Sequence, residues 1–181
     1  MANRVYLMNH HQSEPALAAE LEEACLLAAS YQLPILWMAL FDSDDLTNVL
    51  VHCENDAGEE VSELVLTCFA STEKALKTYS SRRQNLQVAL GVDSAVSLSE
   101  WDAFMTSQLQ APVVQIDLTE LWMMYGDAYA LDSQVSEWLT GLDDTTSAAW
   151  ASFCEQANLS DADTCRYGVR GYPWNATLEW Q

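Results

Sequence analysis

A run of nine residues, Leu33–Phe41, carries no charged side chain and is followed directly by Asp42-Ser43-Asp44-Asp45. Both of its alternating faces are apolar, so it has to be buried, either as an interior strand or as an interior turn of helix. Pro34 prevents a helix from passing through the run. Because no apolar run approaches the roughly 18 residues of a membrane span, we expect a soluble protein that encloses this segment and has no membrane partner.

The composition can supply the core that such a segment needs. The chain has 181 residues, of which 50% are hydrophobic and 10% aromatic, and a chain of this size buries roughly 70% of its unfolded surface. No internal repeat and no Pro/Gly/Ser linker divides it. We therefore expect one globular domain over residues 1–181, in which residues 165–181 form an irregular tail that is anchored on the core by aromatic side chains.

Apolar periodicity and capping residues predict an α+β fold, with a small antiparallel or mixed sheet packed with about five or six helices. Strands are expected at residues 5–8, 49–53, 64–69 and 113–117, with the second and third forming a hairpin. Helices are expected from Ser13 through Ala28, from Ser71 to Gly91, and at residues 99–109, 119–125, 133–139 and 147–157. The expected core consists of Leu17, Leu21, Ile35, Trp37, Leu40, Leu66, Phe69, Leu76, Leu86, Leu90, Trp122 and Trp138.

The cysteines and the first residues bear on the compartment. The five cysteines are odd in number and have neither CxxC nor paired spacing, which favours reduced thiols over a disulfide framework. The opening residues contain only a four-residue apolar run after Arg4, so they do not form the apolar region of a signal peptide. Both observations predict a cytoplasmic protein.

Charge is the property that most narrows the function. Asp and Glu number 27 against 7 Lys and Arg, which gives a net charge of −20. This charge exceeds the magnitude of about 2–8 that solubility requires, and it repels phosphate backbones and anionic lipids, so no nucleic-acid partner is expected. Residues 71–92 are the exception, because they carry four basic side chains and one acidic one. We expect these basic residues to pair with acids of neighbouring elements.

No catalytic or cofactor-binding motif is found. The chain has no phosphate-binding glycine loop and no hydrolase nucleophile elbow. Neighbouring side chains such as His10 and His11 point apart in a strand, so they do not form a metal site. A calcium loop aligned on Asp42 would have Thr47 in place of its glycine and Cys53 in place of its final glutamate. We therefore expect no metal, no cofactor and no enzymatic activity.

Several short segments resemble small acidic immunity proteins encoded beside bacterial polymorphic and contact-dependent toxins. They are the opening Met-Ala-Asn-Arg-Val-Tyr-Leu, the run Pro34–Phe41 that ends in acids, the long helix after Ser71 and the late Gly171-Tyr-Pro-Trp. The resemblance covers about the first hundred residues and the tail. It implies a non-catalytic cytosolic inhibitor that binds a toxin domain and occludes its active site, and it assigns no catalytic residue to this chain.

Electrostatics leads to the same interpretation, since a stable acidic body is suited to cap a basic cleft. We expect the cognate toxin to be met by carboxylates that leave rigid elements through short connections. One alternative is a DNA-mimic regulator of a nucleic-acid-binding protein. Another is a small enzyme that uses Asp42, Asp44 and Asp45 with a divalent metal. The oligomeric state is left open. The predicted partner-binding residues are Asp42, Asp44, Asp45, Glu54, Asp56, Glu59, Glu60, Asp143 and Asp144.

Overall fold

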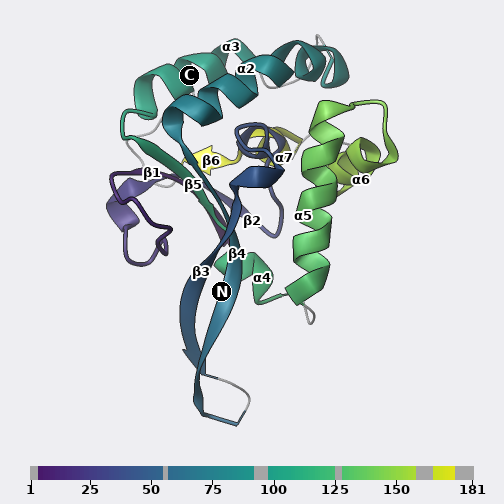
Figure 1. Ribbon diagram of the computed structural model, residues 1–181. Coiled ribbons are helices and arrows are strands. Elements are labelled where there is room, and N and C mark those ends of the chain that lie inside the picture. Colours follow the sequence, from purple (N-terminus) through teal and green to yellow (C-terminus); the bar gives the residue numbers. More distant parts are fainter. Residues whose placement is uncertain (1–3, 55–56, 92–97, 125–127, 158–164, 174–181) are drawn as a thin grey trace.

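The computed structural model describes residues 4–54, 57–91, 98–124, 128–157 and 165–173. At its centre lies a six-stranded sheet with the order β3-β4-β5-β1-β2-β6, in which all neighbours are antiparallel (Figure 1). The α+β class predicted from the sequence is confirmed. The strands are β1 Arg4–His10, β2 Cys25–Ser30, β3 Leu46–Glu54, β4 Glu60–Ser71, β5 Val113–Asp117 and β6 Tyr172–Pro173.

Seven α-helices lie within the described residues, one or two more than the sequence predicted. None of these helices has the length and apolar composition that crossing a membrane requires. Two 3-10 turns, η1 Glu22–Ala24 and η2 Ser43–Asp45, complete the described elements. The helices are α1 Ile35–Met38, α2 Thr72–Ala89, α3 Leu98–Gln108, α4 Thr119–Trp122, α5 Ala128–Asp143, α6 Ala148–Gln156 and α7 Cys165–Arg170.

The two faces of the sheet are covered differently. One face presents Leu7, Leu27 and Ile116 to the main core, which is completed by side chains of the helices. The other face presents Met8 and Cys25 to the loop that contains η1. In Figure 1, α2 and α3 run together across one end of the molecule, and α5 and α6 stand beside the sheet.

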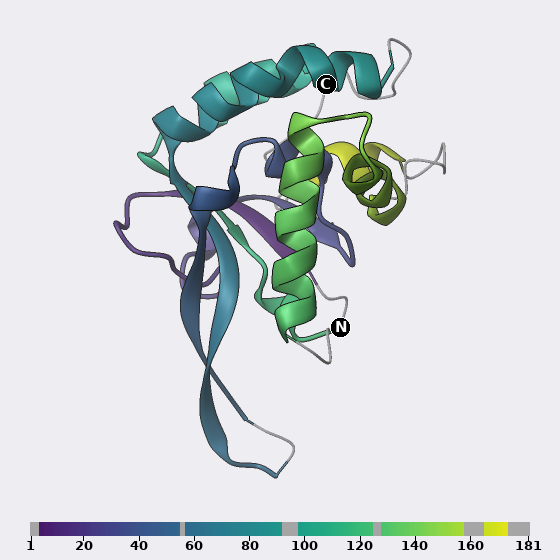
Figure 2. The ribbon, with the colours of Figure 1, turned by 45° about the vertical axis from the view of Figure 1, so that its right-hand side comes forward.

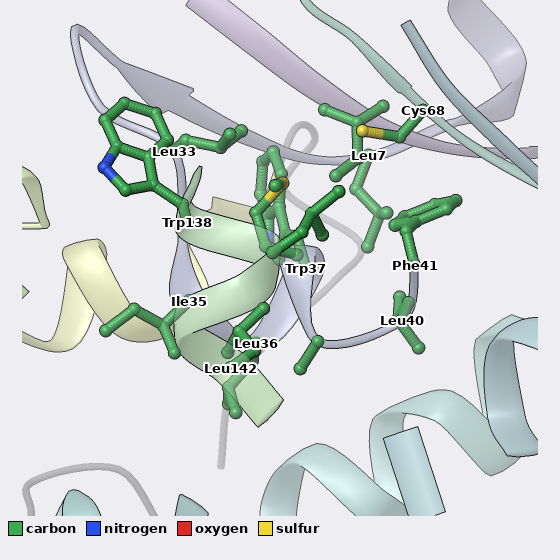
Figure 3. Close-up of a cluster of buried hydrophobic side chains, with 14 of the residues drawn as sticks. Leu7, Leu33, Ile35, Leu36, Trp37, Leu40, Phe41, Cys68, Trp138 and Leu142 are labelled. Carbon is green, nitrogen blue, oxygen red and sulfur yellow. The ribbon is translucent and has the colours of Figure 1, made fainter. Parts of the chain in front are cut away.

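The apolar run that precedes Asp42 is the centre of the main core. All of Leu33–Phe41 is buried, and its middle forms the single helical turn α1, one of the two structures expected for it. Figure 3 shows this segment together with Leu7 and Cys68 of the sheet and with Trp138 and Leu142 of α5. Six of the twelve predicted core residues are buried: Ile35, Trp37, Leu40, Leu66, Leu86 and Trp138. The other six are partly buried: Leu17, Leu21, Phe69, Leu76, Leu90 and Trp122.

The prediction of a helix from Ser13 through Ala28 is wrong. The first part of this stretch is a loop with one 3-10 turn, and the second part is the strand β2. The loop is held by side chains of β5: the Ala16 amide donates to Gln115 Oε1 at 3.1 Å, and the Ala18 amide donates to Asp117 Oδ2 at 2.6 Å. Buried side chains thus satisfy main-chain groups that a helix would have satisfied itself.

The described part of the tail, residues 165–173, packs on the core and is not irregular. Residues 165–170 form α7, and β6 pairs with β2. The Trp37 indole donates to the Arg170 carbonyl at 2.9 Å, and Tyr172 Oη lies 3.0 Å from Ser30 Oγ. Residues 174–181, which include the predicted anchors Trp174 and Trp180, lie outside the described residues.

The remaining predicted elements agree with the structure to within a few residues. The hairpin of β3 and β4 is confirmed, and so is the strand at 113–117. Helix α2 begins after Ser71, whose hydroxyl accepts a hydrogen bond from the Lys74 amide at 3.2 Å. Ser147 caps α6 in the same way through the Trp150 amide. The predicted helix at 133–139 is part of the longer α5.

Candidate protein-binding site

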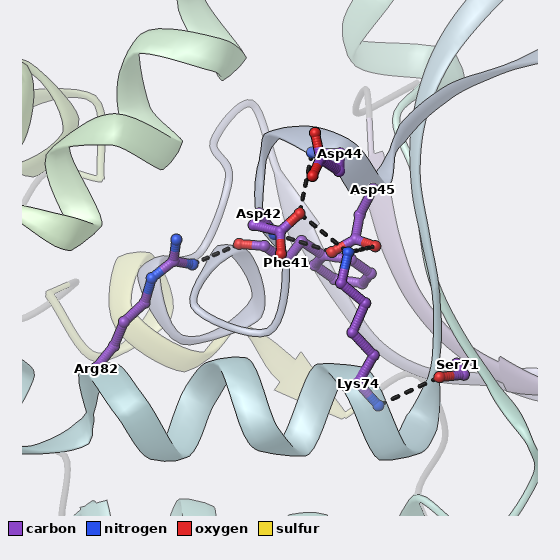
Figure 4. Close-up of polar contacts among 7 residues, drawn as sticks. All are labelled: Phe41, Asp42, Asp44, Asp45, Ser71, Lys74 and Arg82. Carbon is purple, nitrogen blue, oxygen red and sulfur yellow. Dashed lines mark hydrogen bonds and ion pairs between the residues drawn. The ribbon is translucent and has the colours of Figure 1, made fainter.

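The acidic segment after Phe41 is folded against the protein itself. Asp42 and Asp45 cap η2 reciprocally: the Asp42 amide donates to Asp45 Oδ2 at 3.0 Å, and Asp42 Oδ1 accepts from the Asp44 amide at 2.9 Å. The Lys74 ammonium of α2 lies 2.7 Å from Asp45 Oδ1 and 3.1 Å from Asp42 Oδ1 (Figure 4). Of the three carboxylates of this segment that were predicted to meet a partner, Asp42 and Asp45 are therefore engaged in contacts within the protein.

Burial separates the two capping carboxylates electrostatically. Only 5% of the Asp45 side chain is exposed. This burial raises the pKa of Asp45, although hydrogen bonds from the Asp42 amide and from Lys74 act to lower it. Burial also acts to raise the pKa of Asp42, but hydrogen bonds from Lys74 and the Asp44 amide outweigh it, so that pKa lies below its ordinary value. Asp44 is exposed. It is the only member of the trio whose side chain is free to meet a partner without unmaking η2.

The same contacts bear on the metal-dependent alternative. The place where a divalent cation would sit between Asp42 and Asp45 is taken by the Lys74 ammonium. In the part of the chain that the structure describes, no group of three His, Cys, Asp or Glu side chains is arranged to hold a metal ion. The three aspartates therefore do not form the metal centre that the alternative requires.

Three of the four basic residues of α2 pair with acids of neighbouring elements, as predicted from the sequence, whereas the exposed Lys77 forms no ion pair with a described residue. Besides Lys74, Arg82 donates to the Phe41 carbonyl and, through Nε, to Asp143 Oδ1 at 2.6 Å (Figure 4 shows the Phe41 contact). Arg83 contacts Asp102 Oδ2 at 2.6 Å. These ion pairs tie α2 to the segment before η2, to α5 and to α3.

The predicted site residues at the end of α5 and in the turn after it are exposed but also have local roles. Asp143 has 64% of its side chain exposed and neutralises the buried Arg82. Asp144 Oδ1 accepts from the Thr146 amide at 3.0 Å and from its hydroxyl at 2.7 Å. These hydrogen bonds lower the pKa of Asp144, with the Thr146 hydroxyl as the largest cause. The pair therefore shapes the turn into α6.

A second group of predicted residues lies on a projection that we call the arm, Asn48–Glu54 with Glu60–Leu66. β4 pairs with β5 only over Thr67–Ser71, so the arm is a two-stranded ribbon beyond the body of the sheet. Figures 1 and 2 show it extending past every helix. At the base of the arm, one face carries the buried side chains of Val49, Val51 and Val65. Partly buried side chains from the η1 loop and α4 pack on them. Its outer part is free of the body.

The arm carries an acidic end. Glu54, Glu59 and Glu60 are exposed there, and Glu63 is exposed further along β4. Glu54 stands directly opposite Glu60 in the antiparallel register. Like charges in that position destabilise a ribbon, so the sequence retains a locally unfavourable pair at the end of the arm. Asp56 falls outside the described residues.

An exposed apolar pair lies on the same face of the arm. Leu50 and Leu64 are directly opposite one another, with 51% and 63% of their surfaces exposed. Because alternate residues of a strand share a face, Leu50 lies on the face that Glu54 and Glu60 also occupy. The combination of an apolar pair with carboxylates beyond it is typical of a protein interface, with an apolar centre and a charged rim.

The structure thus divides the predicted site residues among three places. Asp42, Asp44 and Asp45 precede β3, whereas Glu54 ends it, so the two groups are separated by nine residues, or about 30 Å at roughly 3.3 Å per residue. Asp143, the last residue of α5, and Asp144, which follows it, form the third place. The sequence analysis missed Leu50, Glu63 and Leu64 as site residues. Their exposure depends on how far the hairpin projects, which the alternation within each strand does not reveal.

An apolar-lined cavity lies between the η1 loop and the end of β5. It has a volume of about 190 Å³, and its lining includes Arg4, Cys25, Asp117 and Glu120. Burial raises the pKa of Cys25 to about 12, so its thiol is protonated at neutral pH and is a weak nucleophile. The Asp117 carboxylate accepts amide hydrogen bonds from Ala18 and Thr119. Both groups are accounted for by the packing of the loop.

Comparison with models of protein families, with curated proteins and with solved structures finds no match for this chain. Its function has to be inferred from the arrangement of its own residues.

Proposed function

We propose that this protein is an immunity-type inhibitor, a non-catalytic cytoplasmic protein that binds a basic toxin domain and occludes its active site. This is the role that the resemblance to acidic immunity proteins implies. The observation that carries the proposal is the arm, which presents exposed leucines and, in Glu54, Glu60 and Glu63, carboxylates that pair with no Lys or Arg of the described residues. A two-stranded ribbon can also enter a cleft that is too narrow for the rest of the body.

The distribution of ion pairs supports this assignment. Lys74, Arg82 and Arg83 are neutralised by acids around α2, at the opposite end of β4 from the acidic end of the arm. Within the described residues, no Lys or Arg pairs with Glu54, Glu60 or Glu63. Their field is directed into solvent, where it can attract a basic surface over about one Debye length.

The exposed leucines favour this role over mimicry of DNA. A DNA mimic needs carboxylates at the spacing of phosphates along an extended face. Leu50 and Leu64 interrupt the acidic surface of the arm, and burying such a pair stabilises a complex by about 25 cal/mol per Å² of apolar surface. A protein partner with an apolar contact beside its basic residues suits this surface better.

The test uses the protein encoded by the reading frame adjacent to this one. We expect that protein to arrest growth when it is expressed alone, and co-expression of this chain to restore growth. The double reversal Glu60→Lys with Glu63→Lys should abolish protection. The matched reversal Glu14→Lys with Glu23→Lys changes the net charge equally at exposed positions away from the arm, and it should retain protection. An adjacent product without toxicity, or equal loss in both variants, would contradict the proposal.

A further inference from the structure

One edge of the sheet has neither a partner strand nor protection among the residues that the structure describes. β3 is the first strand in the order, and in the described part of the chain no main-chain group pairs with its outer side. Every second residue of an edge strand directs its N–H and C=O outward, which leaves about four or five unpaired residues over the nine of Leu46–Glu54.

Natural edge strands are protected by Lys, Pro, bulges or short length. β3 contains neither Lys nor Pro, and its register runs unbroken from Leu46 opposite Cys68 to Glu54 opposite Glu60. The other edge strand, β6, carries such protection, since one of its two described residues is Pro173. The contrast indicates that the outer side of β3 is kept available for pairing.

Charge determines which kind of strand can pair there. The stretch 46–71 has five carboxylates and no Lys or Arg. A second copy of this chain would bring another net charge of −20 to the same place, so self-association through β3 is opposed by repulsion. A basic segment is attracted instead.

The register specifies the segment further. An added strand places its side chains beside those of β3, and Leu50 and Glu54 share one face. A matching segment therefore has an apolar residue beside Leu50 and a Lys or Arg four residues away, beside Glu54.

We propose that β3 is extended by a strand of the basic partner, an extended segment with an apolar residue and a Lys or Arg four residues apart. Main-chain hydrogen bonds along Leu46–Glu54 give this contact its geometry, and the Leu50 side chain and the Glu54 carboxylate give it selectivity. This inference rests on the proposed function, because it takes the arm as the surface that meets the toxin.

The test uses a capped nine-residue peptide with Lys at both ends, Leu at its centre and Thr or Val between them. Its symmetric sequence fits β3 in either direction. The control peptide has the same side chains, but the backbone nitrogens of its residues 2–8 are all methylated, which removes main-chain donors from both of its edges without changing charge. We expect the parent peptide to bind the full chain and to slow amide hydrogen exchange in Leu46–Glu54, and methylation to weaken binding about tenfold or more.

A pair of variants separates pairing at the edge from docking on the face. Leu50→Lys and Leu64→Lys make the same change at exposed positions, but only position 50 adjoins an added strand. We expect Leu50→Lys to weaken peptide binding about fivefold more than Leu64→Lys. The proposal is wrong if the two variants weaken binding equally, if both peptides bind equally or if neither peptide binds. It is also wrong if this chain forms a dimer in which the β3 amides are protected from exchange.

The outcome can be read separately from the test of immunity. If the adjacent gene product is not toxic while the peptide results hold, the proposed function fails and the edge site stands. If toxin protection depends on Glu60 and Glu63 but both peptides bind equally, the immunity role stands and strand addition is wrong.

Discussion

Asp45 shows how a residue chosen for its charge can instead serve the fold. It leaves a buried segment, as a presented carboxylate would, but it accepts from the Asp42 amide and from Lys74 and is itself buried. Lys74 lies 29 residues further along the chain. No local pattern identifies that pairing, so the sequence could place the acidic segment but not say which of its members face solvent.

We expect Asp45→Ala to lower the free energy of unfolding by about 2–3 kcal/mol, because it removes a cap and leaves the Asp42 amide without its acceptor. Asp44→Ala, at an exposed position of the same turn, should change that free energy by less than about 0.5 kcal/mol. Urea melts of the two variants provide the measurement. Equal effects would show that neither the cap nor the hydrogen bond from the Asp42 amide to Asp45 contributes to stability.

His10 adds a dependence on pH. Its Nε2 lies 3.0 Å from Gln115 Oε1, and its Nδ1 accepts from the Gln12 amide at 3.3 Å, an arrangement that requires a neutral ring. Burial lowers the pKa of His10, and the hydrogen bond that the ring donates to Gln115 opposes this shift only in part. The unfolded chain therefore binds the proton more tightly, and stability is lost as the pH falls below the unfolded value of about 6.5.

The expected result is a larger loss of unfolding free energy between pH 7.5 and pH 5.5 in the parent than in His10→Gln. The carboxylates lower the unfolding free energy of both proteins by the same amount over this pH range, so their effect cancels when the two losses are compared. Denaturant melts at the two pH values measure both losses. Identical losses of unfolding free energy in the two proteins would mean that the His10 ring takes up a proton without disturbing the loop held by Gln115.

The helices and strands that were predicted correctly are those whose ends are determined by residues close by in the sequence. Ser71 caps α2 through an amide three residues away, and Pro112 precedes β5, so adjacent residues were enough to predict both. The loop before β2 has the apolar spacing of a helix, yet Gln115 and Asp117, about a hundred residues away, bind its amides. The extent of the arm is equally non-local, because it depends on where β5 stops pairing with β4.

Gly171 connects α7 to β6 at a place that admits no side chain. Its φ is +70°, and a Cβ there would lie 2.4 Å from Trp37 Cζ2 and 2.9 Å from the Ala28 carbonyl. Gly91 has a φ of +81° with nothing within 4 Å of a Cβ. The two glycines therefore share the backbone requirement and differ only in packing.

Gly91→Ala should lower the unfolding free energy by about 1–2 kcal/mol, the cost of a left-handed conformation. Gly171→Ala should lower it by about 1–3 kcal/mol more, since it also overpacks against Trp37. Thermal melts of both variants test the difference. If the two substitutions cost the same, the tail does not pack on Trp37 as described.

For the whole molecule, the attraction of a basic partner depends less on the net charge than on where carboxylates have no basic neighbour. Lys74, Arg82, Arg83 and Arg170 form ion pairs around α2 and α3, whereas no Lys or Arg of the described residues pairs with Glu54, Glu60 or Glu63 of the arm. At about 0.15 M salt the Debye length is about 8 Å, so a partner at the arm senses the nearby carboxylates far more than the rest of the acidic surface.

This difference predicts how association with the toxin depends on salt. At about 0.15 M salt, Glu60→Lys with Glu63→Lys should slow association about tenfold, whereas Glu14→Lys with Glu23→Lys should leave it nearly unchanged. At about 0.02 M salt both pairs should slow association, because screening no longer confines the field to the arm. Stopped-flow rates over this range measure the effect. If both pairs slow association equally at every salt concentration, the partner is steered by net charge and meets another surface, of which the exposed Asp143 and Asp144 are the next to test.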